Sequence, residues 1–118
     1  MKSFRELRVW QQAMTLVEEV YLLTHEFPNQ ETYGLMSQVR RAVISVPSNI
    51  AEGHTRAHLK EYLHHLSVAQ ASLAEVETQL EIATRLKYLG PNQLSELLPE
   101  INSLGKQLYA LRNALTRT

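Results

Sequence analysis

The strongest constraint on the fold of this sequence is a heptad row of apolar residues. The row keeps alternating steps of three and four residues, at Leu59, Tyr62, Leu66, Ala69, Leu73, Val76, Leu80 and Ala83. This spacing places the side chains on one stripe of an α-helix, whereas the side chains of a β-strand alternate between two faces. We therefore predict a helix from about Ala57 to Tyr88, ended by Gly90 and Pro91.

The length of this helix sets the shape of the molecule. At 1.5 Å per residue it would be about 48 Å long, while a compact sphere of this chain length would be about 35 Å across. The fold must therefore be elongated.

Three further segments have helical periodicity, and they span about Leu7 to His25, Glu31 to Glu52 and Gln93 to Leu115. Because a proline ring removes an N–H and crowds the preceding turn, we expect a kink or a break just before Pro47, and a kink or a later helix start at Pro99. Four amphipathic helices joined by short loops favour an all-α fold, an elongated antiparallel up-and-down four-helix bundle. A coiled-coil dimer is the lesser alternative.

Length and composition restrict the domain count and the class of function. The 118 residues form a single four-helix-bundle domain (residues 1–118), and the 12 Lys and Arg balance 12 acidic residues, all of them glutamate. The absence of cysteine excludes disulfides and thiol nucleophiles, and the absence of aspartate removes a frequent partner of catalytic histidines and of magnesium. The four glycines stand singly and form no phosphate-binding loop. We expect no enzyme activity, no cofactor and no small-molecule substrate.

The chain contains no segment that resembles a membrane anchor or an export signal. Charged residues interrupt the first positions, where a signal peptide would need an apolar core, and no run approaches about 18 apolar residues. We expect a cytoplasmic protein that does not contact a membrane.

A cluster of histidines carries the alternative function, that of a metal-binding enzyme. His54, His58, Glu61 and His65 follow steps of four, three and four along one flank of the predicted helices, which is metal-ligand spacing. Glu61 and His64 also form one Glu-x-x-His, half of the di-iron motif of helical bundles, but the second copy is missing. The competing interpretation is a solvated helix face.

Basic residues between positions 40 and 65 suggest a nucleic-acid site. Arg40, Arg41, Arg56 and Lys60 stand there against two glutamates, with four histidines that gain charge in mildly acidic solution. We predict that these four basic residues contact RNA. The alternative is structural: Arg40 packs its aliphatic stem beside the core, and Arg41 pairs with a glutamate across an interface.

The first helical segment has more apolar surface than a monomeric bundle needs. Its apolar residues form two rows, Leu7, Trp10, Met14, Val17, Tyr21 and Val9, Ala13, Leu16, Val20, Leu23. Two rows predict contacts on two sides, one of them with another subunit. We expect the small residues Ser45 and Ser48 to form the opposing surface, and the two unlike faces to associate head-to-tail in a homo-oligomer.

A set of residues resembles the bacterial four-helix-bundle family named after proteins encoded in intervening sequences of 23S ribosomal RNA genes. The resemblance covers residues 4 to about 89 and is strongest at Trp10-Gln11, Phe27-Pro28, Glu31-x-Tyr33-Gly34-Leu35, Gln38-x-Arg40-Arg41-Ala42, Asn49-Ile50-Ala51-Glu52-Gly53 and Ser72-Leu73-Ala74-Glu75. The resemblance implies a bundle that forms a ring, commonly a pentamer, without known enzyme activity. One branch of the family resembles accessory proteins of diversity-generating retroelements, which implies RNA or a reverse-transcriptase-like protein as partner. That branch is clearly basic, whereas this chain has no net charge.

Overall fold

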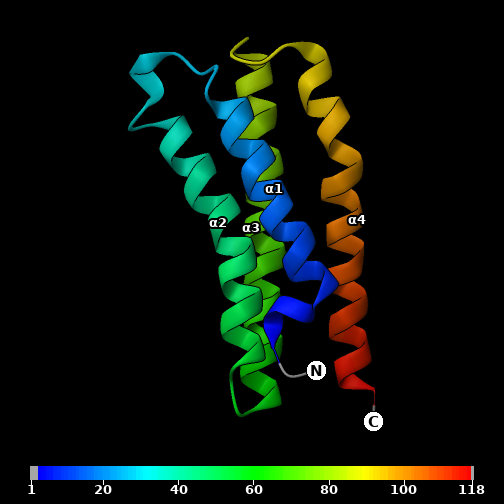
Figure 1. Ribbon diagram of the computed structural model, residues 1–118. Coiled ribbons are helices and arrows are strands. Elements are labelled where there is room, and N and C mark those ends of the chain that lie inside the picture. Colours follow the sequence, from blue (N-terminus) through cyan, green and yellow to red (C-terminus); the bar gives the residue numbers. More distant parts are fainter. Residues whose placement is uncertain (1–2, 118) are drawn as a thin grey trace.

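The computed structural model describes residues 3–117, and four long helices dominate it (Figure 1). They are α1 (Arg8–Thr24), α2 (Leu35–His54), α3 (Leu59–Arg85) and α4 (Pro91–Thr116), with short 3-10 helices at Phe4–Glu6 and Asn29–Glu31. The described residues contain no strand, and none of their helices is both long and apolar enough to cross a membrane. The bundle measures 47 × 25 × 20 Å. The predicted elongated, all-α, up-and-down bundle is therefore confirmed.

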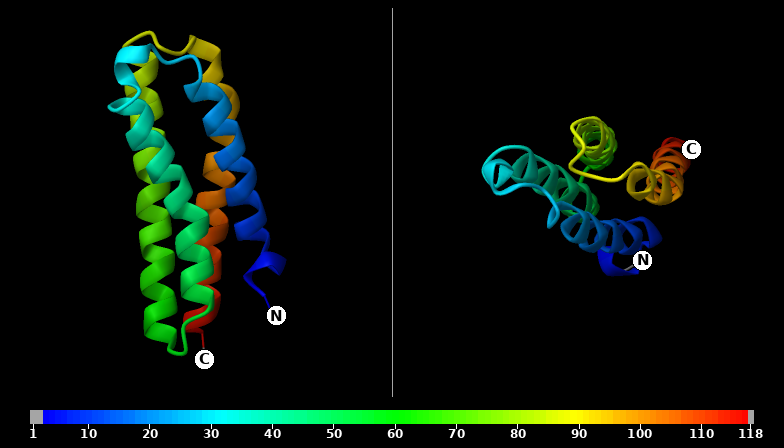
Figure 2. Two further views of the ribbon diagram at one scale, coloured as in Figure 1. Left: turned by 60° about the vertical axis from the view of Figure 1, so that its left-hand side comes forward. Right: turned by 90° about the horizontal axis from the view of Figure 1, so that it is seen from above.

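The helices alternate in direction, so the two ends of the bundle differ (Figures 1 and 2). The start of α1, the α2–α3 turn and the end of α4 lie at one end, which we call the terminal end. The α1–α2 and α3–α4 connections lie at the opposite end, which we call the loop end. Neighbours in the sequence pack side by side, and α1 also contacts α4 along the loosest of the four seams.

The heptad row of α3 forms the centre of one hydrophobic core. Its residues from Leu66 to Ala83 are buried, Tyr62 is half-buried, and Leu59, at the start of the helix, is 47% exposed. The helix is shorter than predicted because it ends at Arg85. Two residues later, Lys87 adopts a left-handed conformation with a φ of 66°. Gly90 precedes α4 and donates its N–H to Gln93 Oε1 at 2.6 Å, so it starts that helix rather than ending α3.

A side-chain cap explains why α2 starts at Leu35 rather than at the predicted Glu31. The Glu31 carboxylate accepts a hydrogen bond from the Leu35 N–H at 3.0 Å and another from the Tyr88 hydroxyl at 2.8 Å. The bond from the Leu35 backbone, followed by that from Tyr88, lowers the pKa of Glu31. One carboxylate thus satisfies an N-terminal donor of α2 and ties the two connections of the loop end together.

Both internal prolines lie within continuous helices. Pro47 is buried in α2, which Figure 1 shows bent but unbroken. Pro99 lies in α4, which begins eight residues earlier at Pro91, so the later start considered for this helix is wrong. Packing of the neighbouring apolar residues Leu97 and Ile101 holds the helix through Pro99.

Candidate nucleic-acid interface

The structure separates the four predicted RNA-binding residues into two groups. Arg40 and Arg41 lie in the half of α2 nearer the loop end, whereas Arg56 and Lys60 flank the α2–α3 turn at the terminal end. The helical rise of 1.5 Å per residue puts Arg41 and Arg56 about 22 Å apart. Closeness in sequence therefore does not create a single basic patch.

Arg40 is occupied by contacts with α1. Its Nε donates to Thr24 Oγ1 at 2.8 Å, and a terminal nitrogen donates to the Tyr21 carbonyl at 3.2 Å. The guanidinium also lies over the Tyr21 ring, 4.3 Å from the ring centroid. Arg40 thereby donates to a carbonyl near the end of α1 and packs on the Tyr21 ring. These contacts suit the structural role that was the alternative to RNA contact.

Arg41, Arg56 and Lys60 are exposed. Arg41 lies at a shallow hollow between α2 and α3 that Glu75 also lines, and Arg56 contacts Glu61 at 3.8 Å. An ion pair this long between two exposed side chains contributes little to stability, so Arg56 can exchange Glu61 for a phosphate. Lys60 has no ion pair with any residue that the structure describes.

The histidines that suggested a metal site have other neighbours. The His54 ring meets Tyr62 edge-on with centroids 5.9 Å apart, and His65 Nδ1 lies 2.9 Å from Asn49 Oδ1. Across residues 3–117, no three histidine or glutamate side chains come together as they would around a metal ion. The spacing along the helix therefore does not produce a converging set of ligands.

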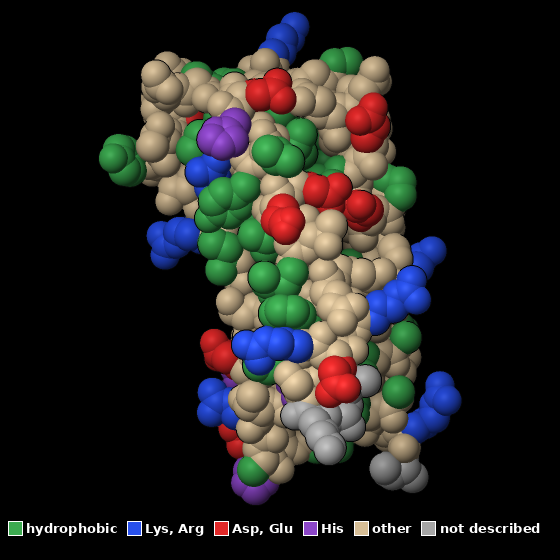
Figure 3. Space-filling model, viewed as in Figure 1, with side chains coloured by type: hydrophobic (Ala, Val, Ile, Leu, Met, Phe, Trp, Pro, Cys, Tyr) green, Lys and Arg blue, Asp and Glu red, His purple; other side chains and the backbone are tan. Residues whose placement is uncertain are grey.

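The balanced charge of the chain is distributed unevenly along the bundle. In the terminal half (residues 3–15, 46–71 and 104–117), basic residues outnumber acidic ones: Arg5, Arg8, Arg56, Lys60, Lys106, Arg112 and Arg117 against Glu6, Glu52 and Glu61. In the loop half, acidic residues outnumber basic ones: Glu18, Glu19, Glu26, Glu31, Glu75, Glu77, Glu81, Glu96 and Glu100 against Arg40, Arg41, Arg85 and Lys87. Figure 3 shows acidic side chains gathered toward the loop end of one face. The terminal end is therefore the electropositive part of the molecule.

The sequence analysis missed most of this basic surface. Arg5, Arg8, Lys106, Arg112 and Arg117 join Arg56 and Lys60 in the terminal half. Arg5 lies over the Phe4 ring at 4.8 Å, and Arg112 donates to Gln70 Oε1 at 2.6 Å. The separation of charge could have been predicted from the sequence. The predicted helix directions assign each charged residue to one half of the bundle, and the basic residues then gather in the terminal half.

Polar and small side chains join α2 closely to α3. Ser72 Oγ donates to Ser45 Oγ at 2.9 Å, and Asn49 Nδ2 donates to the Ser45 carbonyl at 2.8 Å. A Cβ on Gly53 would lie 2.8 Å from the His65 Cβ and 3.0 Å from the Tyr62 ring, so only glycine fits there. Ser45 therefore forms a hydrogen bond with α3 of the same chain and is half-buried there, while its place on an intersubunit surface stays a prediction.

An apolar groove runs between α1 and α2. The two apolar rows of α1 face different surroundings. One row is buried in the core, at Val9, Ala13, Leu16 and Val20, while Met14 of the other row is 41% exposed. The groove is lined by Trp10, Met14, Val17, Ile44, Pro47, Ser48 and Ala51, and Figure 3 shows hydrophobic side chains over these helices. Ser48 lines this groove, whereas Ser45 lines the hollow between α2 and α3.

Comparison with known proteins agrees with this architecture. Residues 5–110 match the family model described as 23S rRNA-intervening sequence protein. The chain belongs to this family. A similar fold is found in the crystal structure of a protein of unknown function from the S23 ribosomal protein family of Bacteroides thetaiotaomicron, with a TM-score of 0.78 and 19% identity over 88% of this chain and 97% of that one. No curated protein matches the chain. Neither the family description nor the structural relative carries a known enzyme activity.

Proposed function

We propose that this member of the family is a non-enzymatic interaction protein that assembles into a homo-oligomer and binds RNA through its terminal end. The observation that carries the proposal is the separation of charge, which makes one end of a chain with no net charge electropositive. The reverse-transcriptase-like partner that the resemblance implies stays a prediction.

The residues at the terminal end suit contacts with the RNA backbone. Lys60 is exposed without an ion pair among the described residues, and Arg56 has only its long contact with Glu61. Such side chains neutralise phosphates and release counterions, which gives sequence-tolerant, salt-dependent binding.

Association of subunits would enlarge this surface. The apolar groove between α1 and α2 is the surface that we assign to contact with another copy, because Met14 and Ile44 are exposed there at 41% and 42%. In a closed ring whose axis runs along the bundles, all terminal ends lie on the same face. A ring would thus combine several weak basic ends into one strong binding surface. The number five is an expectation from the family resemblance alone.

Retention of single-stranded RNA on filters at about 50 mM salt tests the RNA proposal. The double variant Arg56→Glu/Lys60→Glu should bind RNA at least about tenfold more weakly, and its affinity should depend less steeply on salt. The matched control, Arg85→Glu/Lys87→Glu, makes the same charge change at the loop end and should bind like the parent.

Two results would remove the RNA proposal. One is parent protein that retains no RNA at this salt concentration, where phosphate contacts are strongest. The other is an equal loss in the terminal-end and loop-end variants, which would show that total charge and not the terminal end determines binding.

A further inference from the structure

The seam between α1 and α4 is open enough to hold two hollows, one after the other. Near the middle of the bundle it holds a pocket of about 300 Å³ lined by Gln12, Thr15, Leu16, Pro99, Glu100, Ser103 and Leu104. Toward the loop end a second hollow on the same two helices is lined by Glu19, Leu22, Leu23, Glu26, Gln93, Glu96 and Leu97. Together these residues define what we call the α1–α4 groove. It extends from Gln12 to the end of α1 at Thr24, about 18 Å along the helix, and beyond it to Glu26.

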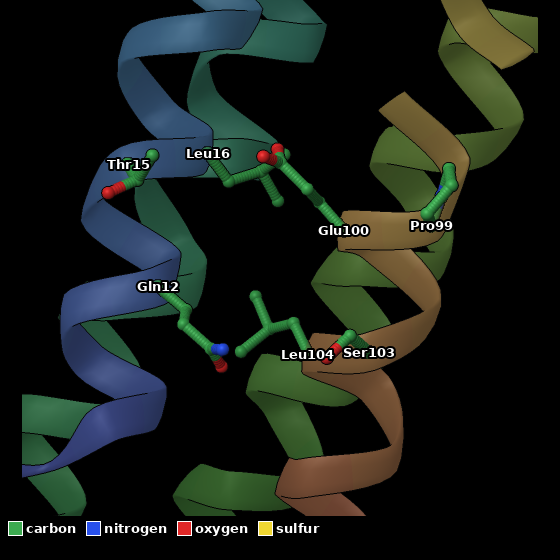
Figure 4. A pocket seen from close by; sticks show the side chains of 7 residues that line it. All are labelled: Gln12, Thr15, Leu16, Pro99, Glu100, Ser103 and Leu104. Carbon is green, nitrogen blue, oxygen red and sulfur yellow. The ribbon is translucent and has the colours of Figure 1, made fainter. Parts of the chain in front are cut away.

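The groove is acidic and has no basic lining residue. Glu19 and Glu26 line it from α1, and Glu96 and Glu100 line it from α4, while none of the lining residues is lysine, arginine or histidine. Figure 4 shows Glu100 extending from α4 across the space toward α1. Burial, followed by a hydrogen bond with Glu100 and the nearby charges of Glu100 and Glu18, raises the pKa of Glu19 to about 7. Burial and Glu100 therefore favour a protonated Glu19 below neutral pH, and Glu26 accepts a hydrogen bond from Gln93 Nε2 at 2.6 Å. Glu96 and Glu100 are the groove carboxylates left for a basic ligand.

One acceptor atom at the groove lacks a donor. Gln12 Oε1 is buried and has no hydrogen-bond partner among the described residues. Figure 4 shows the Gln12 amide pointing from α1 toward Leu104 of α4. A buried acceptor without a donor is unfavourable, so this atom suits a ligand that supplies N–H groups. Lysine and arginine side chains supply such donors together with positive charge.

The groove also has an apolar component. Leu16, Leu97 and Leu104 are buried at its base, while Leu22 stands at its edge with 69% of its surface exposed. A free metal ion would make no use of these leucines, and no three acidic or histidine side chains among residues 3–117 are placed to hold one. The combination of an apolar base, acidic sides and an unused acceptor fits an amphipathic polypeptide that is basic.

We propose that the α1–α4 groove binds a basic amphipathic helix of a partner protein. The groove length corresponds to about 14 helical residues, or four turns. Leucines spaced at three and four residues would contact Leu22 and the apolar base, and flanking lysines or arginines would pair with Glu96 and Glu100. This partner uses the seam between α1 and α4 and contacts neither Arg56 nor Lys60, so its binding does not depend on the RNA proposal.

A labelled 14-residue peptide with leucines at helical spacing and lysines elsewhere is the probe, measured by fluorescence anisotropy at low ionic strength. Glu96→Gln/Glu100→Gln should weaken its binding by about tenfold or more, because two groove charges are lost. The matched control Glu77→Gln/Glu81→Gln removes two exposed charges at the same spacing on α3 and should leave the affinity unchanged. A peptide of the same composition with scrambled leucines should bind more weakly than the patterned one.

The same measurements can overturn the proposal. Equal binding of the scrambled peptide, or equal losses in the groove and control variants, would reduce the groove to unspecific charge attraction. Saturation of the groove by millimolar Mg²⁺ or spermidine that fully blocks the patterned peptide would identify a small cation as the occupant. A change of oligomeric mass in Glu96→Gln/Glu100→Gln would identify a second copy of the chain as the occupant.

Discussion

Individual family motif residues stabilise the contacts among α1, α2 and α3. Arg40 satisfies a carbonyl of α1, Glu31 caps α2, and Asn49 links α2 to His65 of α3. Gly53 lets these two helices approach where a Cβ would clash. The sequence marked these residues as a set, but it could not assign their roles, because each role depends on a partner at least four residues away and usually on another helix. None of these contacts forms a catalytic arrangement.

Glu19 makes stability depend on pH. Its pKa rises from 4.5 to about 7 in the folded state, first because of burial and then because of Glu100, so the folded protein holds a proton that the unfolded chain releases. Stability should therefore be full below about pH 4.5, fall as the pH rises, and reach its lower level above pH 7. Glu19→Gln removes the charge and should stabilise the protein by about 1 to 2 kcal/mol at pH 8, allowing for partial exposure, but hardly at pH 4.5.

Urea unfolding of parent and Glu19→Gln protein across this pH range measures the effect. Glu77→Gln, an exposed change on α3, is the control and should follow the parent at every pH. A constant difference between Glu19→Gln and the parent from pH 4.5 to 8 would contradict the assignment of a raised pKa to Glu19.

At the scale of elements, periodicity predicts helix faces better than helix ends. The buried stripe of α3 was predicted from Leu66 to Ala83 because a heptad row has one possible face. The start of α2 was not predicted, because it depends on the Glu31 carboxylate, which lies four residues before the first helical N–H that it caps. Neither proline interrupts its helix, although a break at Pro47 and a later start at Pro99 were among the predicted outcomes, because tertiary packing offsets the local cost of a proline within a helix.

Leu73, midway along this stripe, tests the register of α3. It is 4% exposed and lies near Gly105 of α4, so Leu73→Ala should leave a cavity between the two helices and cost about 2 to 5 kcal/mol of unfolding free energy. Ile82→Ala truncates an apolar residue of the same helix that is 41% exposed, and it should cost less than about 1 kcal/mol. Coincident urea midpoints for the two variants would show that the register is wrong.

At the scale of the whole molecule, the alternating helix directions give a chain with no net charge a basic end and an acidic end. Residues distant in the chain, such as Arg8, Lys60 and Arg117, reach the same half because α1 and α3 start there and α4 ends there. The direction of each helix was predictable from the sequence, and so was this separation. The α1–α4 groove was not predictable, because its openness follows from how closely two helices pack, which periodicity does not determine.

The oligomer is the prediction that joins these surfaces. The apolar groove between α1 and α2 exposes Met14 and Ile44 side by side with other apolar lining residues, so a second copy should cover it. Native mass spectrometry at micromolar concentration should report one closed species above a dimer, expected to be a pentamer. Met14→Glu/Ile44→Glu should dissociate it, because charges buried at an apolar interface cost several kcal/mol. Ile82→Glu, on α3 and equally exposed, should leave it intact. A monomeric parent would contradict the assembly and the combined basic face; equal dissociation by Ile82→Glu would instead move the interface away from α1 and α2.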